Sequence, residues 1–502
     1  MKSPEFQSKS DRTLGLVSLL GLVVLSILYL FAFRLSEKEF PPTWPDEVLF
    51  YSPSMDFATH GTFRTLVLEG LIRGMEYKTL WVPPLFFILN GGVLSFFGGG
   101  LEVIRFFSAL VSLGSVWLFW FLLKEIGFSP RARLGACLLL VTDLLFLRVG
   151  WTARMEALCL FWALASIFVL ARKVSWNGEA KNDLTFLEGF GSGFFLGLSF
   201  LSHPFGAVFG IPVLFLIHRA KAWNIWTFWA GGSLPLIAWA IWIHPDWELF
   251  IIQFGAQFGR KRELLQTFSP LTKVKVLLGG YESPGSRLWF YLALLFGVWV
   301  VRKELLERKN LAFFLSLWLS TILAFLFLST EYYYVMYLCL PLSAFGGFFF
   351  ERIRSRRIQY VAGLLVFCNL FILFYAYRKI GFANPEFDLN AKFSRAILTE
   401  LKGSKRVYLQ AIPDPYFDLV EGLPHSKILE FIPGELPIPA EEFLPTLQTI
   451  DAFVFSEGQK RNEHIQRFLE ENSNKFRIKS VSVEPSTPRK LVKAEAVIYL
   501  RR

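Results

Sequence analysis

The acidic residues that could take part in chemistry stand where an apolar segment begins. Asp46 and Glu47 follow the sequence Pro-Pro-Thr-Trp-Pro, shortly after the first apolar stretch. A carboxylate beside a membrane surface can act as a general base toward an acceptor hydroxyl or amine. Asp and Glu also favour the first turn of a solvated helix after proline. The motif alone therefore leaves a catalytic and a structural interpretation open.

A second acidic position, Glu156, lies in the sequence Trp151-Thr-Ala-Arg154-Met-Glu156 at the start of a later apolar run. The charge pattern described below places this position on the same side of a membrane as Asp46. Two carboxylates that are far apart in the chain can therefore share one site. The alternative is a structural role, in which Arg154 pairs with Glu156 or with a lipid phosphate and caps the helix.

Further polar residues stand at the outer ends of apolar spans. Arg105 begins one span and could meet a lipid phosphate, whereas His203 separates two spans and is, as a single histidine, more often structural than a ligand. Three consecutive tyrosines begin a later outer span: Tyr332, Tyr333 and Tyr334. Such residues normally form an interfacial aromatic belt, although they could also hold a polyprenyl chain or a sugar.

Two charged residues, Asp143 and Arg148, lie inside an apolar run. Charges are costly in hydrocarbon, so these residues are functional candidates by default. They could also simply pair with each other, and Arg148 is close enough to the outer end of its span to extend its guanidinium to the membrane surface.

The composition requires a membrane. Of the 502 residues 53% are hydrophobic, 17% are aromatic and only 19% are charged, and the mean hydropathy is +0.43. A soluble chain could not bury so much apolar surface. The net charge of +11 comes largely from Lys and Arg clusters at the ends of apolar segments. That distribution is typical of cytoplasmic loops of membrane proteins, and we expect no nucleic-acid partner.

The charge pattern predicts the topology. The basic residues Lys2, Lys9 and Arg12 place the N-terminus in the cytoplasm, and the first apolar stretch is a retained signal anchor. We expect about eleven crossings, with the C-terminus outside. Besides the first helix they are 102–122, 134–150, 154–171, 187–202, 205–219, 225–243, 288–301, 310–328, 332–350 and 358–377. The short apolar segment 83–98 is predicted to be a re-entrant or surface-lying helix.

The sequence divides into two predicted domains. Residues 1–379 form an all-α polytopic membrane domain, whose outer loop 34–80 carries Asp46. Residues 380–502 are rich in charges and prolines and are predicted to form a soluble α/β domain outside the membrane. The predicted elements of this domain are strands at 406–412, 427–432, 451–455 and 496–500 and an amphipathic helix at 460–471.

Nucleotide and zinc motifs are absent from the sequence. There is no Walker motif, dinucleotide fingerprint or His-Glu-x-x-His pattern, and the four cysteines lie inside apolar runs without metal-ligand spacing. An enzyme that works outside without a nucleotide site needs an activated donor already in the membrane, and polyprenyl-phosphate sugars meet that need. Asp46 and Glu156 could share a divalent ion, but we predict no metal or other cofactor.

The order of these motifs resembles the GT-C-fold glycosyltransferases. Trp44-Pro-Asp46-Glu47, followed by Asp56-Phe-Ala-Thr-His-Gly61, is similar to their first-loop signature. Within that class the chain is most similar to protein O-mannosyltransferases and the aminoarabinose transferase that modifies lipid A. The resemblance covers roughly residues 10–375 and continues through these motifs: Pro83-Pro84-Leu85, Arg105-Phe-Phe-Ser108, Thr152-Ala-Arg154-Met-Glu156 and Tyr334 to Pro341.

The resemblance implies a role for each acidic residue. Asp46 would be the general base, Glu47 would help to position substrate, and Glu156 would orient the acceptor or support the base. The family implies inversion at the anomeric carbon, largely without a metal. Lysines that relatives use are replaced here, for example by Val82, so we expect a rebuilt phosphate site that includes Arg105, Arg154 and His203.

We therefore predict an inverting hexosyl- or pentosyltransferase in the cytoplasmic (inner) membrane. It would move a monosaccharide from a polyprenyl-phosphate donor to an envelope glycan, lipid or protein acceptor on the outer side. Two alternatives remain: a transporter or flippase for a lipid-linked glycan, and a catalytically inactive scaffold of the same fold. The C-terminal domain is expected to cap the membrane part or to play an accessory role.

Overall fold

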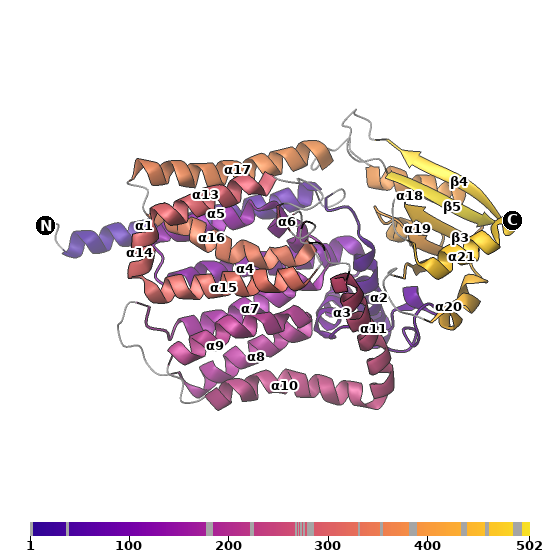
Figure 1. The fold of residues 1–502 in the computed structure, drawn as a ribbon, viewed down its shortest axis with the longest axis horizontal. Helices are drawn as coiled ribbons and strands as arrows, with labels where there is room; N and C mark the ends of the chain where they lie inside the picture. Colours follow the sequence, from indigo (N-terminus) through magenta and orange to yellow (C-terminus); the bar gives the residue numbers. More distant parts are fainter. Residues whose placement is uncertain are drawn as a thin grey trace.

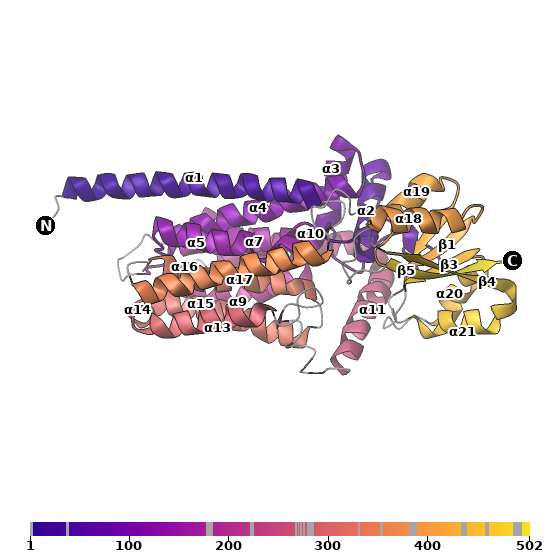
Figure 2. The same ribbon diagram turned by 90° about the horizontal axis from the view of Figure 1, so that it is seen from above.

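The computed structural model is mostly helical, with one small sheet near the C-terminus. It describes the chain except for residues 1–3, 37–39, 177–183, 221–224, most of 267–285, 330–331, 352–354, 381–388, 433–438, 457–460 and 485–493. Figures 1 and 2 show the long helices side by side and roughly parallel, with the sheet beyond one end of them.

Six helices in the described part of the chain are long and apolar enough to cross a membrane. They are α1 (Pro4–Ser36), α4 (Leu101–Glu125), α10 (Ile225–Ile243) with the helix that follows it, α15 (Lys309–Leu328), α16 (Met336–Glu351) and α17 (Arg356–Ile380). Their outer faces expose large apolar side chains, such as Leu16 at 69% and Trp226 at 78%. Such a surface is stable only in lipid, which confirms a multi-pass membrane protein.

Shorter apolar helices lie among these spans. They are α3 (Leu85–Phe97), α8 (Phe186–Ser202), η2 (Pro204–Phe209) with α9 (Gly210–Arg219), and α13 (Ser286–Val300). The segment 83–98 is thus a short helix, as its apolar run indicates, and its position relative to a bilayer stays a prediction. The number of eleven crossings also stays a prediction.

The predicted span 134–150 is divided into two helices. α5 (Pro130–Val141) ends before Asp143, and α6 (Leu144–Gly150) begins after it. A carboxylate oxygen of Asp143 accepts the N–H groups of Leu145 and Phe146 at 2.9 and 3.3 Å, which makes Asp143 the N-cap of α6. α7 (Met155–Ala171) then bends by 107° from α6, so the chain turns sharply at 151–154.

Asp143 also forms a buried ion pair with Arg287 from α13. The guanidinium donates to the Asp143 carboxylate at 2.8 Å, and each side chain is 4% exposed. A pair of Asp143 with Arg148, which the sequence suggested as one alternative, stays a prediction. The contact between Asp143 and Arg287 joins α13 to the break between α5 and α6.

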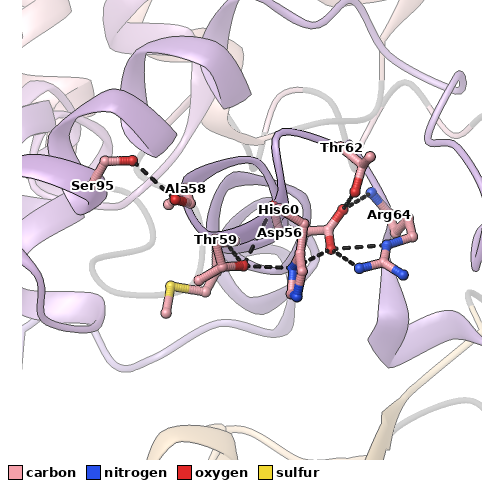
Figure 3. A network of polar contacts seen from close by, with 8 residues as sticks. Asp56, Ala58, Thr59, His60, Thr62, Arg64 and Ser95 are labelled. Carbon is pink, nitrogen blue, oxygen red and sulfur yellow. Dashed lines mark hydrogen bonds and ion pairs between the residues drawn. The ribbon is translucent and has the colours of Figure 1, made fainter.

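The outer loop is held by a second buried acid. α2 (Pro45–His60) ends near Asp56, whose carboxylate accepts hydrogen bonds from Thr62 Oγ1 at 2.6 Å and from the Arg64 backbone and guanidinium at 2.9 and 2.6 Å, as Figure 3 shows. Burial raises the pKa of Asp56, but the hydrogen bonds from Arg64 and Thr62 outweigh it and keep the pKa below its ordinary value. These bonds fix the turn into η1 (Leu66–Leu68).

α11 (Trp247–Gln266) supports the same loop from the other side. Figures 1 and 2 show α11 turning away from α10 and lying between the long helices and the sheet. The Lys78 ammonium contacts Asp246 at 2.7 Å, and the Gln253 side chain accepts the N–H of Leu80 at 2.6 Å. The loop between α2 and α3 is therefore an ordered layer on top of the membrane helices.

The C-terminal part is a five-stranded mixed sheet with helices on both faces. The strands are β1 (Arg406–Gln410), β2 (Lys427–Glu430), β3 (Ala452–Ser456), β4 (Phe476–Val483) and β5 (Ala494–Arg501), in the order β2-β1-β3-β5-β4. β1 is parallel to β2 and β3, whereas β5 is antiparallel to β3 and β4. The helices are α18 (Leu389–Glu400), α19 (Tyr416–Gly422), α20 (Ala440–Leu447) and α21 (Glu463–Glu471).

This sheet confirms the predicted α/β fold class. The four predicted strands are present with small shifts in their ends, and α21 covers most of the predicted helix, whose first residue lies outside the described residues. β4 was not predicted. It is an edge strand in which polar residues interrupt the apolar ones and only Phe476 is buried, so it lacks the continuous apolar run of the predicted strands. The boundary between 379 and 380 stays a prediction.

The sheet shares a hydrophobic core with the outer loop. Val48 of α2 and Leu68 of η1 are fully buried in the same cluster as Tyr408, Leu429 and Phe453 of the sheet. Lys427 also forms an ion pair with Glu69. Because apolar burial is roughly additive with area, this continuous core holds the sheet firmly against α2.

We expect Asp143→Asn to destabilise the protein by about 3–5 kcal/mol, because it leaves Arg287 charged and buried without its partner. Asparagine keeps the N-cap of α6, so the loss reports the ion pair. Thermal unfolding of the detergent-solubilised protein measures the change as a fall in Tm. The double variant with Arg287→Gln should recover part of the loss, and an unchanged Tm in the single variant would contradict the assignment.

Candidate active site

Arg154 joins the two acidic positions that the sequence singled out. Its guanidinium forms an ion pair with Asp46 from the start of α2 and another, at 2.8 Å, with Glu156 from the first turn of α7. Arg154 is 5% exposed and Glu156 is completely buried. The structure therefore brings Asp46 and Glu156 to one place, as the sequence predicts, through an arginine that contacts both.

Asp46 is the open member of this group. Its side chain is 30% exposed, while those of Arg154 and Glu156 are 6% and 0% exposed. Solvent can therefore reach the side chain of Asp46, whereas Glu156 is buried and contacts the same Arg154 guanidinium. This arrangement suits a base at the surface of the site and a buried acid that fixes the orientation of the arginine.

Glu47, the neighbour of Asp46, is fully engaged inside the protein. Its Oε1 accepts from Arg105 Nε and from the N–H of Ala153, both at 2.8 Å. Its Oε2 accepts from Arg105 Nη2 at 2.6 Å and from the N–H of Trp44 at 3.1 Å. Glu47 thus ties the start of α2 to α4 and to the turn before α7, and this holds Asp46 next to Arg154.

Arg105 consequently faces Glu47, and its predicted contact with a donor phosphate stays a prediction. Both side chains are almost fully buried, at 1% and 0% exposed. A fork of two hydrogen bonds between a guanidinium and a carboxylate fixes both groups in one plane. The predicted substrate contact of Glu47 also stays a prediction.

Aromatic rings line the other side of Arg154. The Arg154 guanidinium lies 3.7 Å from the centre of the Tyr333 ring and 5.6 Å from that of Phe50. Trp44 meets Tyr333 edge to face, with 6.2 Å between ring centres. A cation over an aromatic face is stabilised by the ring quadrupole, so these rings hold Arg154 in position without neutralising it.

His203, which lies near Glu156, contacts Tyr334. The His203 Nδ1 accepts the N–H of Phe205 at 3.0 Å, and its Nε2 lies 3.3 Å from the Tyr334 hydroxyl. Because Nδ1 is an acceptor, a neutral His203 carries its hydrogen on Nε2. The side chain of Tyr332 lies outside the described residues.

Two further acids, which the sequence reasoning missed, come from the C-terminal sheet. Glu430 is the last residue of β2, and Asp414 follows β1 in the sequence Ile-Pro-Asp-Pro. The N–H of Asp414 donates to the carbonyl of Thr43 at 2.9 Å, three residues before Asp46. The only available signal was an acid at the carboxyl end of each of two short apolar strands.

Burial favours the uncharged form of both of these acids. Burial raises the pKa of Asp414 to about 8, the N–H of Tyr416 opposes this rise, and the charge of Glu47 adds to it. Burial also raises the pKa of Glu430 far above its ordinary value, with further increments from Asp414 and Asp46. The acids of the sheet and those of α2 therefore act on one another.

The described residues contain no group of three or more His, Cys, Asp or Glu side chains arranged to hold a metal ion. The acids at the site contact arginines, backbone N–H groups or one another. The described geometry places one partly exposed carboxylate, that of Asp46, against the guanidinium of Arg154. These are residue types that can transfer a proton and stabilise negative charge.

The membrane helices, the outer loop and the C-terminal sheet together define the GT-C fold. Residues 82–244, about a third of the chain, match the family model described as dolichyl-phosphate-mannose-protein mannosyltransferase. No curated protein matches the chain in sequence. The resemblance to GT-C glycosyltransferases that the sequence motifs indicate is confirmed at the level of the fold.

Solved structures of this fold cover nearly the whole chain. ArnT from Cupriavidus metallidurans, bound to undecaprenyl phosphate, is 12% identical and has a TM-score of 0.57, with 95% of this chain and 97% of that one covered. The archaeal oligosaccharyltransferase AglB from Archaeoglobus fulgidus, in complex with an inhibitory peptide and a dolichol-phosphate, is 13% identical. Its TM-score is 0.51, with 88% of this chain and 69% of that one covered.

We expect Glu47→Gln to lower the stability by about 3–5 kcal/mol, because it leaves the Arg105 charge buried without its counter-ion. Thermal unfolding in detergent measures the loss. The matched control is Glu102→Gln, which changes an exposed acid on the same helix as Arg105 and should leave Tm unchanged. Equal Tm values for the two variants would contradict the structural role of Glu47.

The raised pKa of Asp414 predicts a pH dependence of stability. An unfolded Asp ionises near pH 3.9, whereas folded Asp414 stays protonated to about pH 8. The folded state therefore binds more protons between these values, and stability falls as the pH rises from about 4 to about 8. Urea unfolding at several pH values should show a smaller fall in Asp414→Asn than in the wild type. Identical pH slopes in the two proteins would show that Asp414 is ionised or paired.

Proposed function

We propose that the protein is an inverting glycosyltransferase that moves a monosaccharide from a polyprenyl-phosphate donor to an acceptor outside the cytoplasmic membrane. The observation that carries this proposal is the arrangement around Arg154, with Asp46 open to substrate and Glu156 buried behind it. The GT-C fold and the family match to residues 82–244 support the class of donor.

In this reaction Asp46 is the general base. An acceptor oxygen or nitrogen attacks the anomeric carbon of the donor sugar from the side opposite the phosphate, and its proton passes to the Asp46 carboxylate. The bond between the anomeric carbon and the phosphate oxygen breaks, and its electron pair leaves with the phosphate. The new bond forms with inverted configuration, and no redox partner is needed.

Arg154 is the cation best placed to stabilise the leaving phosphate. Charge builds on the phosphate oxygen as the bond breaks, and a preorganised cation in a poorly solvated site lowers that barrier. Arg154 forms an ion pair with Asp46. A phosphate that accepts hydrogen bonds from this guanidinium competes with Asp46 for it, and this leaves the Asp46 carboxylate available to accept the proton of the acceptor.

The donor needs space for its isoprenoid chain within the membrane region. An apolar cavity of about 660 Å³ lies between α13, α15 and α16, and aliphatic side chains such as Leu294, Leu319 and Leu342 line it. Tyr291 also lines the cavity, and the centre of its ring lies 5.5 Å from the central carbon of the Arg287 guanidinium. The isoprenoid chain of the donor is apolar, so it can occupy this cavity without loss of hydrogen bonds.

Asp46→Asn tests this function in cells that lack the wild-type gene. Loss of the general base should reduce transfer by about 100-fold or more. Mass spectrometry of envelope glycans should then show that one sugar is missing, at an unchanged level of the protein. Glu102→Gln is the control and should restore the sugar. A flippase or an inactive scaffold predicts that Asp46→Asn restores it as well, and that result would refute the proposal.

A further inference from the structure

Asp414 and Glu430 lie at an edge of the sheet where a ligand could bind. They stand at the carboxyl ends of β1 and β2, which are parallel neighbours with Leu409 opposite Glu430. β1 also pairs in parallel with β3 on its other side. The chain leads from β1 to β2 on one side and from β3 to β4 on the other, so the switch point lies between β1 and β3. Open parallel sheets bind ligands beside such a point. Asp414, which follows β1, lies next to it, and Glu430 lies at the end of the next strand outward, β2.

This edge of the sheet faces the candidate active site. Asp414 is hydrogen-bonded to Thr43, and the ring of Phe417 meets that of Tyr51 of α2 edge to face, with 5.0 Å between ring centres. The charge of Glu47 acts on Asp414 and that of Asp46 acts on Glu430. The two acids of the sheet and the two of α2 thus form one group across the interface.

The carboxyl oxygens of this pair have unused hydrogen-bonding capacity. Asp414 is 5% exposed and uses Oδ1 to accept the N–H of Tyr416 at 2.9 Å, while its Oδ2 has no hydrogen-bond partner among the described residues. Glu430 is completely buried, and the N–H of Phe431 acts on its carboxyl group and lowers its pKa. Within the same described part, neither of its carboxyl oxygens makes a hydrogen bond of normal geometry. Buried polar groups are normally paired, so these oxygens lower stability in the absence of a ligand.

We propose that Asp414 and Glu430 form a subsite that binds sugar hydroxyl groups next to Asp46, so that the C-terminal domain completes the active site. This inference rests on the proposed glycosyl transfer. A carboxyl group accepts hydrogen bonds from a hydroxyl and, when protonated, also donates one. A phosphate does not fit here, because the pair adds acids beside Asp46 and Glu47. The hydroxyl groups belong either to the transferred sugar or to a glycan acceptor.

Binding requires a small separation at the interface. Both acids are covered, so a sugar reaches them only when the edge of β1 and β2 moves away from α2. Among the described residues, the backbone hydrogen bond between Asp414 and Thr43 joins the two segments at this point, next to the hydrophobic core that α2 shares with the sheet.

The test compares activity with stability in Asp414→Asn and Glu430→Gln. If the acids are kept for a ligand, removal of the buried carboxyl leaves Tm unchanged or higher, while transfer in membranes falls by about tenfold or more. Asp418→Asn, an exposed acid four residues after Asp414 on α19, and Glu441→Gln, an exposed acid on α20, are the matched controls. Both controls should keep full activity and the wild-type Tm.

Added substrates then identify the source of the hydroxyl groups. Membranes that contain each variant receive an excess of lipid extract rich in polyprenyl-phosphate sugars or, separately, acceptor material from cells that lack the protein. Recovery of transfer by the lipid extract assigns the pair to the donor sugar, and recovery by acceptor material assigns it to the acceptor. Either recovery supports the subsite.

Three results would overturn this inference. Full transfer in both variants would exclude a role for the pair, and a fall in Tm that parallels the fall in transfer would make the pair part of the structural interface. Reduced transfer that neither substrate restores would exclude a binding role. The variant Asp46→Asn distinguishes failure of the subsite from failure of the proposed function. If Asp46→Asn abolishes transfer and Glu430→Gln does not affect it, only the subsite is wrong.

Discussion

The geometry of the site depends on the compensation of one buried charge. Arg154 is nearly inaccessible to water, and an unpaired guanidinium in that position would carry a large desolvation penalty. Two carboxylates, Asp46 and Glu156, supply the compensation from the starts of α2 and α7. This requirement holds two helices together that are about a hundred residues apart in the chain. It also places a solvent-accessible carboxylate beside a cation, which is the combination that a displacement at a phosphate-linked carbon requires.

The backbone turn before α7 places Arg154 where it can pair with both Asp46 and Glu156. The chain turns by 107° between α6 and α7, and Arg154 stands in the turn, where its side chain can reach α2. A second buried pair, Glu47 with Arg105, fixes the start of α2 by four hydrogen bonds, two of them from backbone N–H groups at Trp44 and Ala153. Asp46 and Glu47 are neighbours in different surroundings: the Asp46 side chain is partly exposed, whereas the buried Glu47 holds the backbone of both in place.

The sequence predicted what local patterns encode. Long apolar runs and charge clusters indicated the membrane helices, and short apolar runs in a charged and proline-rich segment indicated the strands of the C-terminal sheet. Motif order singled out Asp46, Arg154 and Glu156, which the structure brings together. The partners of buried charges could not be predicted in the same way, because tertiary packing decides them. Asp143 was recognised as costly in hydrocarbon, but its partner Arg287 lies 144 residues away. The N-cap role of Asp143 likewise divided a run that looked continuous by hydropathy alone.

Asp414 and Glu430 show the same limit more sharply. By sequence each is an acid near the end of a short apolar strand, and only docking of the sheet against α2 makes them buried neighbours of Asp46 and Glu47. The hydrophobic core that joins Val48, Leu68, Leu429 and Phe453 keeps this interface closed despite the acids that it buries. Apolar burial therefore opposes the cost of desolvating four carboxyl groups in one place. A domain that served only as a cap could fill the same interface with apolar side chains and be more stable. The buried carboxyl oxygens of Asp414 and Glu430 that lack a hydrogen-bond partner among the described residues are the reason to propose that this domain takes part in the reaction.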